Sequence, residues 1–189
     1  MYKKGIEYMD EQQSENRIQL REMVKGDWPD VHKYASMESV CKYQPWGPNT
    51  EEESLMFIDE VLQDAKRQPR SRFVFAVFEQ ETATMIGSGE ITIRDTVNRE
   101  GEIGYIFHPD YWGRGYATEV ALLLVNFGFN DLNLHRIYAT CDPRNSASSR
   151  VLEKVGMVME GRLRETLLLK DGWRDSFIYG ILEHEWKCK

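Results

Sequence analysis

The sequence has few cysteines and no long apolar run, and each absence excludes a class of protein. Its three cysteines, Cys41, Cys141 and Cys188, stand far apart, and no Cys-x-x-Cys pair or Cys/His ligand pattern occurs. We therefore expect neither a disulfide scaffold nor a metal site. No segment approaches the roughly 20 apolar residues that a membrane span needs, and the start, MYKKGIEYMDEQQSE, lacks the apolar centre of a signal peptide. These features favour a soluble protein of the cytoplasm that has no membrane partner.

The sequence also has fewer basic residues than acidic ones. The 24 Lys and Arg residues face 31 Asp and Glu residues, which gives a net charge of −7. This balance disfavours a nucleic-acid binder, because neutralising phosphates needs a surplus of basic side chains. Apolar residues are present in the ordinary globular amount, 41% of 189 residues. The length predicts one domain, which we place at residues 16–187, after a polar stretch, residues 1–15, that is typical of a flexible tail.

The pattern of apolar residues predicts strands and helices in mixed order. A strand is expected over residues 17–21, then a helix over about 29–38 that Asp27 could cap. Acidic residues at 51–53 favour a helix start there, because the helix dipole stabilises negative charge in the first turn. Further strands are predicted over residues 73–78, 85–93, 102–107, 136–141, 163–169 and 175–182, and further helices over 117–128 and 148–155. Gly156 follows the last helix, where a left-handed cap is expected. This order predicts an α+β fold.

The most informative segment is a predicted strand that runs through a glycine loop directly into a helix, residues 102–119. The first N–H groups of a helix have no internal partner, and together with the helix dipole they form an anion site. Gly113 and Gly115 let the backbone approach a phosphate closely, and Arg114 can add a charge-assisted contact, which suits a pyrophosphate. The loop is neither a P-loop nor a dinucleotide fingerprint, whose third glycine position holds Thr118 here. The alternative is that the two glycines only shape a tight turn.

Two stretches together resemble a known family. The stretch EIGYIFHPDYWGRGYATEV, residues 102–120, resembles the coenzyme A-binding motif of the GNAT N-acetyltransferases, and most closely the RimJ/RimL-type branch, which acetylates protein N-termini. The stretch DPRNSASSRVLEKVGM, residues 142–157, is similar to that family's Asn-x-x-Ser…Lys-x-Gly-Phe segment. The resemblance covers about residues 15–187. It implies the GNAT fold, a central twisted, mostly antiparallel sheet with one parallel, splayed pair of strands, flanked by helices.

The same resemblance implies an acetyl-CoA donor, an amine acceptor, direct transfer without an acyl-enzyme, and no metal. The cofactor-binding residues that it implies are Ile106, Phe107, His108, Trp112, Gly113, Arg114, Gly115, Tyr116, Ala117, Thr118, Asn145 and Ser148. It also implies that a backbone N–H near Ile106 or Phe107 stabilises the oxyanion where the parallel strands part. The sequence departs from the family at two positions. Trp112 stands where many members have Gln or Arg, although it is common in the proposed branch. Leu152 stands where many relatives carry a tyrosine general acid.

Three residues are candidates for the base that takes a proton from the amine. Glu102 is ranked first, because its side chain shares a strand face with Gly104 and Ile106 and can act through a water. Glu90, on the neighbouring strand, is second, and His108 is third. The alternative for Glu102 is an ordinary charged residue at a strand edge.

The leaving sulfur needs a hydrogen-bond donor, and Ser148 is the candidate that the resemblance implies. Asn145 would contact the pantetheine arm through its amide. The alternative for both is that they only cap a helix. Cys141, at a strand end close by, is expected to be a buried, inert thiol.

The acceptor is less well determined by the sequence. The leading hypothesis is a protein N-terminal amine, as of a ribosomal protein. The alternatives are a small-molecule amine, such as a polyamine, an amino acid or an aminoglycoside, and a non-catalytic acyl-CoA-binding sensor, which Leu152 favours. Tyr43, Trp46, Trp173 and the acids 51–53 are candidates for an acceptor groove, or they only pack and cap. The sequence does not predict an oligomeric state.

Overall fold

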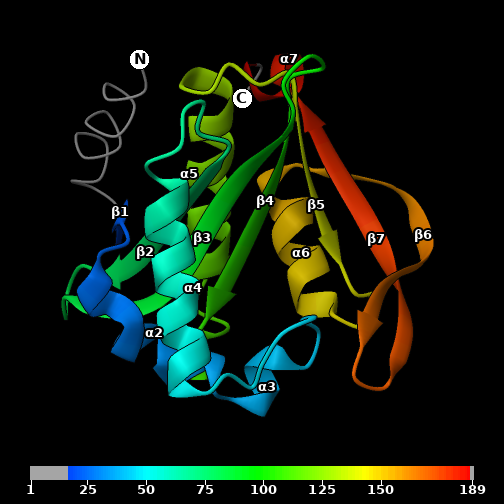
Figure 1. Cartoon of the computed structure of the whole chain (residues 1–189). Helices are drawn as coiled ribbons and strands as arrows, with labels where there is room; N and C mark the ends of the chain where they lie inside the picture. The colour runs from blue at the N-terminus through cyan, green and yellow to red at the C-terminus, as the bar shows by residue number, and fades with distance from the viewer. Residues whose placement is uncertain (1–16, 188–189) are drawn as a thin grey trace.

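The computed structural model describes residues 17–187, which form a seven-stranded sheet with helices on both faces (Figure 1). The predicted tail, residues 1–15, and Cys188 lie outside the described residues. The strand order is β1-β2-β3-β4-β5-β7-β6, and all neighbours are antiparallel except β4 and β5. The strands are β1 (Ile18–Glu22), β2 (Arg72–Glu79), β3 (Thr84–Asp95), β4 (Glu100–Phe107), β5 (Arg136–Cys141), β6 (Val158–Leu169) and β7 (Gly172–Leu182). The predicted GNAT fold, with its single parallel pair, is confirmed.

The helices divide between the two faces of the sheet. They are α2 (Trp28–Ala35), α3 (Glu38–Cys41), α4 (Glu51–Asp64), α5 (Tyr116–Asn130), α6 (Ser146–Val155) and α7 (Glu183–Lys187), with short 3-10 turns at Lys25–Asp27 and Pro109–Tyr111. One apolar cluster joins the sheet to α5 and α6, and a second joins β2 and β3 to α2 and α4. Figure 1 shows α2 and α4 in front of these strands and α5 behind them.

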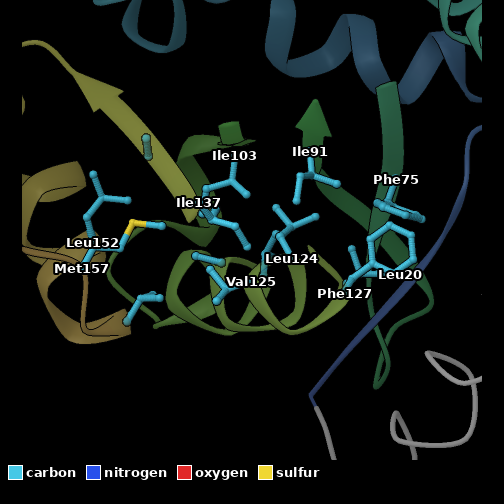
Figure 2. Packing of buried hydrophobic residues seen from close by; sticks show 14 of the residues in the cluster. Leu20, Phe75, Ile91, Ile103, Leu124, Val125, Phe127, Ile137, Leu152 and Met157 are labelled. Carbon is cyan, nitrogen blue, oxygen red and sulfur yellow. The ribbon is translucent and has the colours of Figure 1, made fainter. Parts of the chain in front are cut away.

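The larger cluster is built around α5. Its side chains Leu124, Val125 and Phe127 face Ile91 and Ile137 of the sheet, as Figure 2 shows, and all five are fully buried. Burying a residue of this size contributes roughly 1.5–3 kcal/mol. The glycine loop is therefore fixed to the sheet through the helix that follows it.

The parallel pair opens after three residue pairs. Glu100, Gly101 and Glu102 of β4 lie beside Arg136, Ile137 and Tyr138 of β5, and the pairing ends there. β4 continues to Phe107 without β5 beside it. In Figure 1 the two strands lie close at their starts and diverge toward their ends, and α6 is seen between them in this view. The splay that the family resemblance implied is thus present, and it begins at Glu102.

Some element boundaries differ from the prediction because tertiary contacts outweigh local pattern. The helix predicted over 29–38 ends at Ala35, where Ser36 turns back to the carbonyl of His32, and a separate helix, α3, follows. β6 begins at Val158 instead of residue 163, because the bulged segment pairs with β7 although its own sequence lacks a regular strand alternation.

The predicted cap at the start of α2 is wrong in one respect. Asp27 stands at the N-cap position, but its side chain makes no cap bond there. Its carboxylate instead accepts hydrogen bonds from the Arg21 guanidinium, at 2.8 and 2.7 Å, and from the amide of Val24, at 2.8 Å. Asp27 therefore ties the 3-10 turn before α2 to strand β1.

Candidate active site

The gap between β4 and β5 exposes main-chain groups of β4. The amide of His108 donates to the carbonyl of Ile86 on β3, at 2.9 Å. Because N–H groups point alternately to the two sides of a strand, the amides of Tyr105 and Phe107 point away from β3 and into the gap. The amide of Ile106 points toward β3 instead. Of the two positions that the resemblance implied for an oxyanion donor, Phe107 has the required orientation.

The glycine loop beyond β4 leaves consecutive amides free. Gly113 and Gly115 have φ of +74° and +90°, in the left-handed region that glycine adopts without strain. Within residues 17–187, the amides of 113–117 have no protein acceptor, whereas the next amide, of Thr118, bonds to the Gly115 carbonyl. Free amides at the positive end of a helix suit an anion such as a diphosphate. The loop thus has the donors that a coenzyme A diphosphate requires.

Two contacts hold this helix start in place, and the sequence analysis found neither. The Tyr116 hydroxyl donates to buried Glu79, at 2.5 Å, and this bond lowers the pKa of Glu79 and raises that of Tyr116. Arg17 donates through Nε to Glu119, at 2.7 Å, and through Nη1 to the carbonyl of Arg114, at 3.1 Å. Arg17 and Glu119 are 102 positions apart, so no local pattern signals the pair. Both contacts fix the orientation of the free amides.

Trp112 and His108 close the loop from the side of β4. The indole N–H of Trp112 donates to the carbonyl of Phe107, at 2.9 Å. The His108 ring accepts from the amide of Asp110, at 3.3 Å, and packs edge-on against Tyr111. This bond occupies the lone pair of Nδ1 on His108, so the ring stabilises the turn. The same bond disfavours His108 as the base that takes a proton from the amine.

The start of α6 brings Asn145 and Ser148 to the other side of the gap. The side-chain oxygen of Asn145 accepts from the amide of Ser148, at 3.2 Å, so Asn145 does cap the helix. Its side-chain NH₂ remains available within the described residues. The Ser148 hydroxyl lies 3.1 Å from the hydroxyl of Tyr105, which reaches across from β4. Tyr105 is a site residue that the sequence analysis missed, since nothing in its local pattern distinguishes it from a core tyrosine.

Glu102 stands at the point where the two parallel strands part. Its carboxylate accepts from Arg94 Nε at 2.7 Å, and the hydroxyls of Tyr138 and Thr140 lie at 3.4 Å. These partners leave it half-buried on the face opposite α5. On this face the cluster under α2 and α4 includes residues of β2 and β3 and reaches β4 at Ile106, whereas Glu102 is not part of it.

Glu90 lies on the same face one strand away. It is opposite Gly104 of β4 and is held by Arg72 at 2.8 and 3.1 Å. Arg72 in turn contacts Asp64 of α4. The structure therefore brings both candidate carboxylates to one side of the gap, each with its own arginine.

Comparison with known proteins shows to which protein family the chain belongs. A family model described as acetyltransferase (GNAT) domain matches residues 17–158. The Bacillus subtilis protein named uncharacterized N-acetyltransferase YnaD is 36% identical over 177 residues, which cover 90% of this chain and 96% of that protein. The chain belongs to the GNAT acetyltransferase family. It is an acetyl-CoA-dependent N-acetyltransferase.

Two further relatives bear on this acetyltransferase. Spermidine N(1)-acetyltransferase of Escherichia coli K12 is 28% identical over 173 residues, which cover 92% of this chain and 90% of that protein. A crystal structure of a GNAT-family acetyltransferase from Bacillus anthracis matches with a TM-score of 0.79 at 34% identity, covering 90% of this chain and 97% of that one.

Two residues near the gap are unsuited to catalysis in this acetyltransferase. Leu152 is fully buried among the core residues of α6, at one end of the cluster in Figure 2. It offers neither a hydroxyl nor access to the gap. Cys141 is a buried free thiol, as expected, and burial raises its pKa, which disfavours the thiolate form that a nucleophile needs.

The acidic and aromatic residues considered for the acceptor groove have different surroundings in the structure. Glu53 forms a capping box with Thr50, since its carboxylate accepts from the Thr50 amide at 2.8 Å, and Glu51 and Glu52 lie in the same exposed first turn of α4. Tyr43 contacts Arg144 of the β5–α6 loop, with the guanidinium 5.6 Å from its ring centre. Trp46 and Trp173 are exposed.

Neither a metal centre nor a membrane helix is found in the described part of this acetyltransferase. No group of three or more His, Cys, Asp or Glu side chains among residues 17–187 is arranged to hold a metal ion. None of the helices in that range is long and apolar enough to cross a bilayer.

Proposed function

We propose that the enzyme acetylates the primary amine of a small cationic molecule of the polyamine class. The observation that carries this choice is the placement of Glu90 and Glu102 on the open face beside the gap. Arg72 and Arg94 bind Oε2 of Glu90 and Glu102, so Oε1 of each carboxylate can accept a hydrogen bond from an ammonium group, and the net charge of −7 attracts a cationic amine at longer range. A relative named spermidine N(1)-acetyltransferase, matched over most of both chains, supports the same class.

Each step of the transfer has a residue suited to it. Glu102 accepts the proton that the amine loses, directly or through one water, and Glu90 holds further positive charge of the acceptor. The amide of Phe107 donates to the oxyanion that forms when nitrogen attacks the thioester carbon, and one such donor is worth about 3 kcal/mol of barrier. As the C–S bond breaks, the Ser148 hydroxyl donates to the departing sulfur.

The donor is held mainly by main-chain groups. The free amides of residues 113–117 bind the diphosphate, with Arg114 adding charge. The side-chain NH₂ of Asn145 donates to an amide oxygen of the pantetheine arm, while its oxygen remains in the helix cap. The buried free thiols Cys41 and Cys141 fit a reducing compartment, and we place the enzyme in the cytoplasm.

A protein N-terminal amine is the second candidate acceptor. The motif of residues 102–120, with Trp112 as the first loop residue, favours it because this motif resembles that of the RimJ/RimL-type branch. The exposed Trp46 and Trp173 offer apolar surface that a peptide would cover.

A thiol-release assay with acetyl-CoA distinguishes these acceptors. The panel contains spermidine, spermine, an aminoglycoside, free amino acids and short peptides with different N-terminal residues. We expect the highest kcat/KM with a polyamine. A preference for a peptide would contradict the polyamine hypothesis and favour a protein N-terminus as acceptor. CoA binding without turnover of any amine would favour a non-catalytic acyl-CoA sensor.

A further inference from the structure

The side chain of Tyr105 on β4 reaches across the gap to the start of α6. Its hydroxyl lies 3.1 Å from the Ser148 hydroxyl and 3.5 Å from the Ser148 carbonyl. Its ring packs against the main core cluster, and burial raises the pKa of Tyr105 above its usual range. The phenol therefore carries its proton throughout the physiological pH range.

A count of protons decides how the two hydroxyls are arranged. Ser148 has one hydroxyl proton and two lone pairs, and Tyr105 has one proton. Between two hydroxyls, the phenol is the stronger acid and the better donor. When Tyr105 donates to Ser148, the Ser148 proton is left free, and within residues 17–187 no protein acceptor other than Tyr105 contacts that hydroxyl. The amide of Ser148 donates to the side-chain oxygen of Asn145, and this bond holds the backbone of Ser148 in place at the start of α6.

We propose that Tyr105 is a positioning residue that directs the Ser148 proton at the sulfur of coenzyme A. This inference rests on the proposed function, in which Ser148 donates to the departing thiolate. Donation from Tyr105 also polarises the serine hydroxyl, because hydrogen bonds in a chain strengthen one another. Leu152 leaves α6 without the phenol that many relatives have there, and Tyr105 supplies a phenol from the opposite wall of the gap, one hydroxyl removed from the sulfur.

The chain contains a matched control for this pair. The hydroxyl of Tyr34 donates to that of Ser88, also at 3.1 Å and buried, but between α2 and β3 on the other face of the sheet. Tyr34→Phe and Tyr105→Phe therefore remove the same chemical group from the same kind of bond. Only Tyr105 faces the gap.

The experiment follows the thiol of bound coenzyme A, so it needs no knowledge of the acceptor. Thiolate absorbs in the ultraviolet, and its absorbance against pH gives the pKa of the CoA thiol in complex with wild type, Tyr105→Phe, Ser148→Ala, the double variant and Tyr34→Phe. We expect this pKa to lie below that of free CoA in wild type. Tyr105→Phe lowers the acid dissociation constant of the thiol about three- to tenfold, with the Kd of CoA changed less than about twofold. Ser148→Ala lowers the constant at least as much, and adding Tyr105→Phe to it changes nothing further. Tyr34→Phe behaves as wild type.

Three results would overturn the inference. They are a wild-type thiol pKa equal to that of free CoA, no effect of Tyr105→Phe, or an equal effect of Tyr105→Phe in the Ser148→Ala background, which marks a merely structural role. In each of these CoA still binds, so the donor side of the proposed function stands. Loss of CoA binding in the wild-type protein would overturn both. Turnover of an amine, measured separately, tests the proposed function alone.

Discussion

Gly115→Ala tests whether the loop before α5 holds the donor. Gly115 has φ +90° and ψ −6°, and a Cβ there would lie 3.2 Å from Nη2 of Arg17. An L-residue in the left-handed region costs about 1–2 kcal/mol. The substitution therefore strains the turn and also displaces the guanidinium that ties Glu119 and the Arg114 carbonyl to the start of the helix.

The strain is divided between two measurable quantities. The part that stays in the free protein lowers its Tm, by about 2–4 °C per kcal/mol for a chain of this length. The part that the free protein relieves by rotating the turn returns on binding, because the diphosphate requires the original turn, and it weakens CoA binding by about fivefold per kcal/mol.

Gly172→Ala is the control for this prediction. Gly172 has φ +115°, and nothing lies within 4 Å of its Cβ position. It belongs to the β6–β7 turn, so the same backbone strain arises away from the loop. Thermal unfolding and calorimetric titration with CoA are measured for both variants. A Gly115→Ala variant that keeps the wild-type Tm, which means that the turn has rotated, and still binds CoA as tightly as wild type would refute the assignment of these amides to the diphosphate.

Three further predictions concern the proposed base Glu102, the contact of Arg17 with the glycine loop and the stability of the fold in acid. Glu102→Gln lowers kcat by about 10²–10⁴ with unchanged CoA affinity, and an unchanged rate with the preferred amine removes Glu102 from the mechanism. Arg17→Ala leaves Glu119 uncompensated beside the diphosphate and weakens CoA binding severalfold by calorimetry, more strongly at low salt; equal loss at all salt concentrations would argue against this charge effect. Burial opposes ionisation of Asp27, but hydrogen bonds from Arg21 and the Val24 amide outweigh it and lower its pKa below 3.8. Its carboxylate therefore stabilises the fold above about pH 4 and loses this effect as the pH falls through the lowered value. Urea unfolding at pH 5 and pH 3 should show a smaller pH dependence in Asp27→Asn, and an equal dependence would contradict the assignment.

The sequence predicted the elements whose signal is local. The strand over 136–141 has the observed limits, and Gly156 has φ +96° at the predicted helix cap. The glycine loop was predictable because its chemistry lies in one contiguous stretch. By contrast, the first residues of β6 are exposed and show no regular alternation of apolar and polar side chains, and they become a strand by pairing with β7.

The site was predictable to the same degree. Glu102 and Glu90 were expected on neighbouring strands, and the structure places both on one face, although their roles stay predictions. The contact of Tyr105 with Ser148 spans 43 positions and that of Arg17 with Glu119 spans 102. Such pairs are created by the fold, since no periodicity connects residues that far apart.

Donor binding and acceptor choice use different parts of the chain. In the proposed function the donor meets main-chain amides of the loop and of β4, whose positions are fixed by glycine conformations and by the buried face of α5. In the same proposal the acceptor meets the side chains of Glu90 and Glu102 from neighbouring strands, beside the edge of the α2–α4 layer, and each carboxylate has an arginine partner. Replacing Glu90, for example, would free Arg72 and reverse the local charge without moving any amide of the loop. Charge changes on this face can therefore alter which amine is accepted while the thioester is still held in the same place.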